Sequence, residues 1–167
     1  MKRILKAIAI AGALGASDQV AAHGTEGHAL GSVATSEADL EQTAFGRAGK
    51  SSKVTRSVAV SMSDQMRYDP AEIHVKTGET VRLVLTNKGQ GAHEFVLGTQ
   101  DEIKEHAALM KKFPGMEHDE PSQARVNPGG KEELVWQFNK PGEFYFACLM
   151  PGHYEAGMVG KVIVASK

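Results

Sequence analysis

Hydrophobic and polar residues alternate in a series of short segments that starts at residue 54. Alternation with a period of two places every second side chain on the same face, which is typical of half-buried β-strands. The expected strands cover residues 54–60, 72–76, 80–86, 93–97, 133–138, 143–148 and 158–165. Because turn residues rich in Gly, Pro and Asn separate these segments, the pattern predicts an all-β sandwich.

One segment departs from this alternation and predicts a helix. Over residues 100–113, the apolar side chains of Ile103, Ala107 and Met110 recur at intervals of three and four residues, so they share one helix face. A Pro-Gly pair follows directly and ends the helix. We therefore expect a short helical insertion around residues 100–113 in the sandwich.

The first 22 residues are predicted to be a targeting segment. Two basic residues precede a mostly apolar run, and a small-residue Val-Ala-Ala sequence fits a cleavage site. This combination predicts a signal peptide over residues 1–22. No membrane anchor is expected after cleavage, because the run is too short to span a bilayer. Residues 23–52 show no sustained period, so we expect a flexible N-terminal arm, followed by one domain over residues 53–167.

Composition narrows the function further. The 167 residues carry 19 Lys+Arg and 20 Asp+Glu, a formal net charge of −1, which is not the clustered basic surface of a nucleic-acid-binding protein. One cysteine excludes an internal disulfide and a zinc site built from two or more cysteines. Seven histidines and seven methionines accompany it. Because thioether and imidazole bind soft metal ions, the composition indicates copper chemistry.

Three residues of ligand type lie on one loop between two expected strands. Cys148, His153 and Met158 are separated from one another by four residues each. Thiolate, imidazole and thioether together suit copper in both oxidation states. A trigonal site of two histidines and one cysteine, with a weak axial methionine, needs one more histidine. His93, which follows a Gly-rich loop at 87–92, is the candidate.

These motifs resemble those of the cupredoxins, the small blue-copper proteins that include plastocyanin, azurin, rusticyanin and auracyanin. The resemblance covers residues 54–167. It rests on Asn-x-Gly-x3-His at 87–93, Glu-Phe-Tyr-Phe-Ala-Cys at 143–148 and Cys-x2-Pro-Gly-His-x4-Met at 148–158. It implies a Greek-key β-sandwich that holds one type 1 copper centre.

The resemblance also assigns roles to individual residues. It implies that His93, Cys148 and His153 are the trigonal copper ligands. It implies that Met158 is the weak axial ligand. The carbonyl oxygen of Ala92 would lie on the opposite axial side.

One position departs from the family pattern. Glu94 follows the first histidine, where many cupredoxins have Asn or Ser. The side-chain amide hydrogen bond of those residues is therefore absent. The backbone N–H groups of Glu94 and Met150 remain as candidate donors to the Cys148 sulfur, and bonds of this kind tune a metal's reduction potential.

Three further stretches, at 62–70, 93–98 and 116–121, resemble periplasmic cupredoxins linked to bacterial copper tolerance. This resemblance implies one-electron transfer in the periplasm. The expected exit route for the electron is His153, near which a redox partner protein would dock transiently. Weak docking agrees with the small interfaces of redox encounters.

A second copper site is a separate hypothesis. His106 and Met110 share a helix face, and Met116 and His118 follow just past the helix. The alternative interpretation is that the methionines pack in the core and the histidines lie on the solvated surface. If the four residues bind copper, the chain is a copper-sequestering or delivery protein.

An enzyme is the third class considered. Multicopper oxidases and copper nitrite reductases need additional histidine ligands, often as His-x-His, and a second cupredoxin domain or a trimer interface. This sequence contains no His-x-His and has room for only one sandwich. We therefore do not expect an enzyme.

Overall fold

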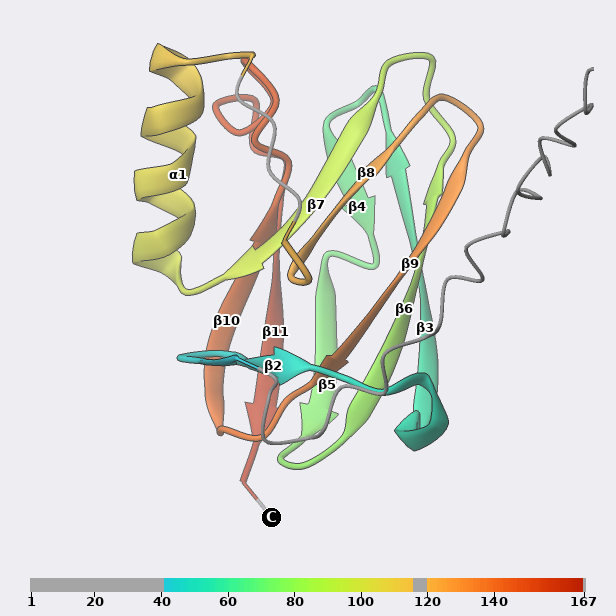
Figure 1. Cartoon of the computed structure of the whole chain (residues 1–167). Helices are drawn as coiled ribbons and strands as arrows, with labels where there is room; N and C mark the ends of the chain where they lie inside the picture. Colours follow the sequence, from blue (N-terminus) through green and yellow to red (C-terminus); the bar gives the residue numbers. More distant parts are fainter. Residues whose placement is uncertain (1–40, 116–119, 167) are drawn as a thin grey trace, which may run out of the picture. The chain divides into compact units, whose positions relative to one another are not determined.

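The structure is a computed structural model that describes residues 41–115 and 120–166. All of them belong to the second of two units, residues 35–167. The expected signal peptide at 1–22 lies outside the described residues. Two sheets form the layers of a sandwich (Figure 1), with strand orders β1-β2-β9-β6-β3-β4 and β5-β11-β10-β7-β8. The chain passes repeatedly between them, which confirms the expected all-β Greek-key sandwich.

The strands pair mostly antiparallel, with two parallel pairs, β3 with β6 and β5 with β11. Their bounds are β1 Gln42–Thr43, β2 Gly46–Ala48, β3 Arg56–Ser63, β4 Arg67–Asp69, β5 Glu72–Lys76, β6 Thr80–Asn87, β7 His93–Gly98, β8 Gln123–Val126, β9 Lys131–Gln137, β10 Gly142–Ala147 and β11 Val159–Ala165. A 3-10 helix, η2, covers Ser51–Lys53. All the strands predicted from alternation are present, with ends that differ by a few residues.

The core lies between the sheets because each strand turns alternate apolar side chains inward. In β5, Ile73 and Val75 are buried while their neighbours are exposed. At its centre, the rings of Phe95 and Phe146 stack with centroids 4.7 Å apart. Tyr68 meets Phe146 edge-on at 4.9 Å. These three aromatic rings belong to the same core cluster as Cys148, the residue that directly follows β10.

The helix expected around 100–113 is present as α1, Gln100–Lys112, on the outside of the sheet that contains β7 and β10 (Figure 1). Thr99 begins it with a capping box, in which its side chain accepts from the Glu102 backbone and Glu102 bonds back. Ile103 and Met110 are its buried side chains. Within the described ranges, no helix is long and apolar enough to cross a membrane.

Part of the segment expected to be a flexible arm is folded instead. β2 pairs with β9, and Phe45 just before it is only 5% exposed. The Phe45 ring stacks on Trp136 at 5.2 Å, and the Trp136 indole N–H donates to the Phe45 carbonyl at 3.1 Å. The expectation for residues 23–52 is therefore wrong from residue 41 onward, because one aromatic side chain ties a Gly- and Ala-rich stretch to the core.

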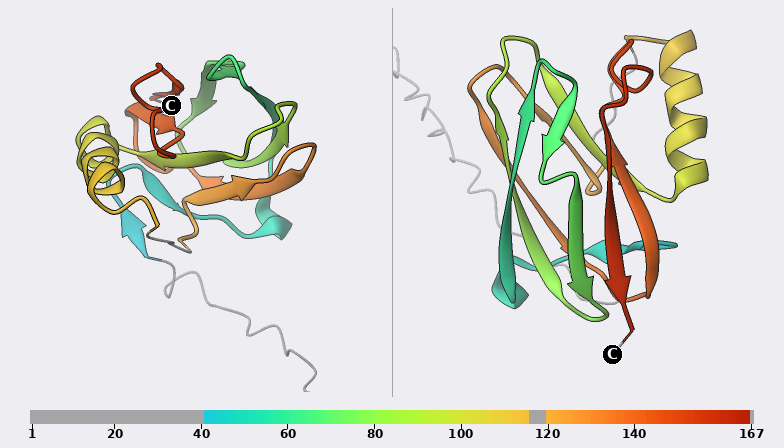
Figure 2. Two further views of the ribbon diagram at one scale, coloured as in Figure 1. Left: turned by 90° about the horizontal axis from the view of Figure 1, so that it is seen from above. Right: turned by 180° about the vertical axis from the view of Figure 1, so that it is seen from behind.

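Four connections gather at one end of the sandwich, uppermost in Figure 1 and facing the viewer in the left panel of Figure 2. They are the β3–β4 turn, the β6–β7 loop, the β8–β9 turn and the β10–β11 loop. The C-terminal end of α1 reaches the same level. All the expected ligands that the structure describes outside the helix lie in these connections or at the strand ends that they join.

Candidate metal centre

Three expected ligands from two distant parts of the chain come together at this end. The metal-binding atoms of His93, Cys148 and His153 all lie within 4.8 Å of one another. Cys148 Sγ is 3.1 Å from His153 Nδ1, and the two imidazole rings are 5.0 Å apart between centroids. Among the described residues, this is the one cluster of its kind that forms. The structure therefore brings these three side chains together.

Cys148 is placed by the strand that precedes it. β10 pairs with β7 and β11, so its last residues are fixed on both sides, and Cys148 is fully buried. Its sulfur accepts a hydrogen bond from the Glu94 backbone N–H at 3.3 Å. Burial raises the pKa of the thiol to about 11, although the Glu94 and Met150 amides oppose this shift. A metal cation must therefore displace the thiol proton when it binds.

His93 begins β7 and is fully buried. Its Nε2 lies 3.2 Å from Asp64 Oδ1, whereas its Nδ1 has no hydrogen-bond partner. A buried polar nitrogen without a partner is costly. Because this nitrogen belongs to the ligand cluster, a metal ion would supply the missing partner.

His153 is the more exposed of the two histidines in the cluster. Desolvation and the proximity of His93 lower its pKa. The ring is therefore neutral at neutral pH, the form in which imidazole coordinates metals. Two histidines and a cysteine in this arrangement match the donor set of a copper centre.

The loop that carries Met158 is folded tightly onto itself. The Met158 backbone N–H donates to the His153 carbonyl at 3.0 Å, and its carbonyl accepts from the Cys148 N–H at 3.1 Å. Gly152 and Gly157 have φ of +84° and +86°, which glycine adopts without strain. Met158 is fully buried, and its backbone contacts both Cys148 and His153. These two turns let one short loop present three ligand-type side chains to the same place.

The hypothetical second site receives no such support. Met110 is 6% exposed and packs in a small apolar cluster with Val96, Ile103 and Leu149, so its thioether is a core contact. His106 is half-buried on α1. Met116 and His118 lie outside the described residues. The packing interpretation therefore holds for Met110, and copper binding by the other three stays a prediction.

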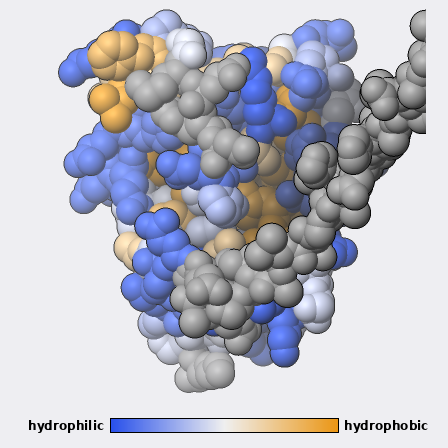
Figure 3. Space-filling view, in the orientation of Figure 1, coloured by the Kyte–Doolittle hydropathy of each residue, from blue (hydrophilic) through white to orange (hydrophobic). Residues whose placement is uncertain are grey.

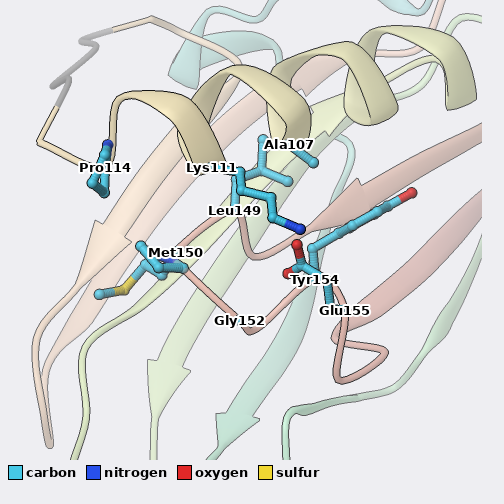
Figure 4. Close-up of a pocket in the computed structure, with 9 residues that line it drawn as sticks. Ala107, Lys111, Pro114, Leu149, Met150, Gly152, Tyr154 and Glu155 are labelled. Atoms are coloured by element: carbon cyan, nitrogen blue, oxygen red, sulfur yellow. The ribbon is translucent and has the colours of Figure 1, made fainter.

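A groove of about 390 Å³ runs between the ligand loop and α1 (Figure 4). Leu149, Met150 and Tyr154 line it from the loop, and Ala107 and Pro114 line it from the helix side. Figure 3 shows apolar side chains gathered at the end of α1 on a largely hydrophilic face. The surface around His153 is therefore partly apolar.

The acidic contact to His93 was not predicted from the sequence. Asp64 lies in the β3–β4 turn, within the stretch 62–70 that supported the resemblance, but no spacing rule connects it to His93. Gln90 and Gly91 donate backbone N–H groups to its carboxylate at 2.7 and 3.3 Å. These hydrogen bonds, of which the one from Gln90 has the larger effect, lower the pKa of Asp64, so its carboxylate is ionised at neutral pH.

Glu94, the departure from the family pattern, forms an ion pair through its side chain. Its carboxylate lies 3.6 Å from the Arg125 guanidinium. Its backbone serves the site instead, because the N–H reaches Cys148 and the carbonyl accepts from the Tyr68 hydroxyl at 2.5 Å. Glu94, which stands where many cupredoxins have Asn or Ser, thus keeps a backbone N–H contact to the Cys148 sulfur.

Comparison with known sequences agrees with this geometry. The family described as "Copper binding proteins, plastocyanin/azurin family" matches residues 54–165. A copper-resistant cuproprotein CopI from Rubrivivax gelatinosus is 53% identical over 139 residues, which cover 83% of this chain and 84% of that protein. A protein of the same name from Pseudomonas aeruginosa is 36% identical, over 72% of this chain and 82% of its own.

Solved structures show the same fold. A reduced auracyanin from Roseiflexus castenholzii superposes with a TM-score of 0.59 at 23% identity, covering 67% of this chain and 98% of that one. Auracyanin B superposes with a TM-score of 0.59 at 20% identity, over 74% and 96%. The fold is therefore shared with proteins of low sequence similarity.

Proposed function

The chain belongs to the plastocyanin/azurin family of copper-binding proteins and binds copper at one centre, and we propose that this centre transfers single electrons in the periplasm. In this proposal His93, Cys148 and His153 hold the copper and Met158 is its axial ligand. The observation that carries the proposal is the partnerless Nδ1 of buried His93 beside the buried Cys148 sulfur. We infer a carrier and not an enzyme, because the described residues form one sandwich with one ligand cluster.

Copper held by thiolate and imidazole supplies a one-electron couple between Cu(I) and Cu(II). The protein's part is to keep the ligands in place in both oxidation states. Cys148 and Met158 are tied to each other through the backbone, and His93 is fixed by the strand that it begins. A site that does not rearrange supports fast electron transfer because little reorganisation is needed.

Copper resistance is the setting that we propose. The support is the likeness to two copper-resistant cuproproteins, one of them 53% identical. The periplasmic location is supported by the signal-peptide pattern of residues 1–22.

We propose further that a redox partner protein docks around His153, beside the groove that Met150 and Tyr154 line. Met150→Glu adds a charge to this rim. It should slow electron self-exchange between two copies about tenfold, a cost of about 1.4 kcal/mol, because the like charges face each other on encounter. NMR line broadening in mixtures of reduced and oxidised protein measures this rate. The matched control is Ser57→Glu, at an exposed position of β3. Equal rates in the two variants would refute this docking surface.

The axial assignment predicts the behaviour of Met158→Leu. The variant should keep the thiolate-to-Cu(II) band, since Cys148 and both histidines remain. Its reduction potential should rise, because leucine offers no donor to the oxidised ion. Each tenfold preferential weakening of Cu(II) binding corresponds to about 59 mV. Voltammetry measures this shift, and an unchanged potential would remove Met158 from the ligand set.

A further inference from the structure

The β3–β4 turn packs against the loop that carries His93. Asp64 in this turn places one carboxylate against three groups at once, since it accepts from the backbone N–H groups of Gln90 and Gly91 and lies 3.2 Å from His93 Nε2. The neighbouring Arg67 donates to the Ala156 carbonyl of the ligand loop at 2.9 Å. The β3–β4 turn and the first residue of β4 therefore contact both loops that build the metal centre.

The fit around Asp64 is close. A side chain at Gly89 would place its Cβ 2.1 Å from Asp64 Oδ1, so this position requires glycine if the carboxylate is to reach the loop. From the inner side, the buried Asn87 amide donates to the Gly91 carbonyl at 2.7 Å and accepts from the Gly89 N–H at 2.8 Å. Asp64 thus meets a loop whose backbone is already fixed.

The consequence for His93 follows from hydrogen-bond chemistry. An ionised carboxylate only accepts hydrogen bonds, so the proton of the neutral ring must lie on Nε2. Nδ1, which has no partner, then carries the lone pair that faces Cys148 and His153. A carboxylate behind a ligating histidine also raises the basicity of the ligand.

We infer that Asp64 is a positioning residue for the copper centre, which fixes the coordinating tautomer of His93 and favours Cu(II) over Cu(I) through its negative charge. This inference rests on the proposed function. The charge stabilises the more positive ion more strongly, so Asp64 holds the reduction potential down.

The test compares Asp64→Ala and Asp64→Asn with the parent. In Asp64→Ala, Cu(II) affinity, measured by competition with a chelator, should fall 10- to 100-fold. Its reduction potential should rise by about 59 mV for each tenfold by which the loss of Cu(II) affinity exceeds the loss of Cu(I) affinity. Asp64→Asn keeps an oxygen acceptor but not the charge, so it should retain more affinity while its potential still rises. The control is Asp101→Asn, whose side chain is 89% exposed at the start of α1.

Nitrogen NMR of the metal-free protein provides a readout that needs no copper. His93 should carry its proton on Nε2 in the parent and populate both tautomers in Asp64→Ala. A parent with the proton on Nδ1, or potentials equal to that of Asp101→Asn in both Asp64 variants, would overturn the inference. A parent with no thiolate-to-Cu(II) band would instead overturn the proposed function, while the tautomer measurement would still test Asp64.

Discussion

Cys148→Ala should abolish the thiolate-to-Cu(II) absorption completely. The band requires a cysteine sulfur bonded to Cu(II), and the sequence has one cysteine. The substitution removes one sulfur atom from a fully buried position at the end of β10, so the fold should persist. Visible absorption of the copper-loaded variant, with circular dichroism to confirm the fold, measures the effect.

The matched control for this experiment is His74→Ala. His74 is a ligand-type residue on β5, but its side chain is 72% exposed and lies 2.8 Å from Glu72, outside the cluster. This variant should keep the full band. A Cys148→Ala protein that remains blue, or a His74→Ala protein that loses its colour, would contradict the ligand assignment.

Phe146→Ala should destabilise the metal-free protein by about 3–5 kcal/mol. The Phe146 ring is fully buried, stacks on Phe95 and meets Tyr68 edge-on, so its removal leaves a cavity lined by two aromatic rings. Because Cys148 lies two residues further along, the cavity should also loosen the metal centre. Chemical denaturation of the metal-free variant gives the loss in the free energy of unfolding.

Leu109→Ala is the control for this measurement. Leu109 is 47% exposed on α1, and a surface substitution of this kind should change stability by no more than about 0.5 kcal/mol. If Phe146→Ala lowers the free energy of unfolding no more than Leu109→Ala does, the aromatic group does not stabilise the core beside the metal centre.

The fold was predictable where a strand carries its own signal. Residues 72–76 were predicted with the observed ends of β5, because Ile73 and Val75 alternate with polar residues and a turn follows. β1, β2, β4 and β8 were missed, and all four are short. Long-range pairing holds two of them, β2 with β9 and β8 with β7. Such pairing leaves no periodic pattern in the sequence.

The residues of the candidate site also divide into those that could be predicted from the sequence and one that could not. Cys148, His153 and Met158 were predictable because they share one loop with regular spacing, and His93 because it ends a recognisable motif. Asp64 was not, since a single carboxylate in a turn has no spacing to a ligand and meets His93 only in the folded chain.

The helix shows the limit of residue type as evidence. Met110 looked like a soft ligand beside His106, and its spacing equally fitted a packing face. In the structure the hydrophobic effect decides, because Met110 is buried with Ile103 against the sheet.

We propose that the protein holds one type 1 copper centre and carries electrons rather than storing copper. A copper titration of the mature protein, which follows the thiolate-to-Cu(II) band and the total bound copper together, distinguishes these two roles. We expect both to saturate at about one equivalent, since the described residues form one ligand cluster. Binding that continues after the band saturates would refute the carrier role and favour copper sequestration through further His and Met residues.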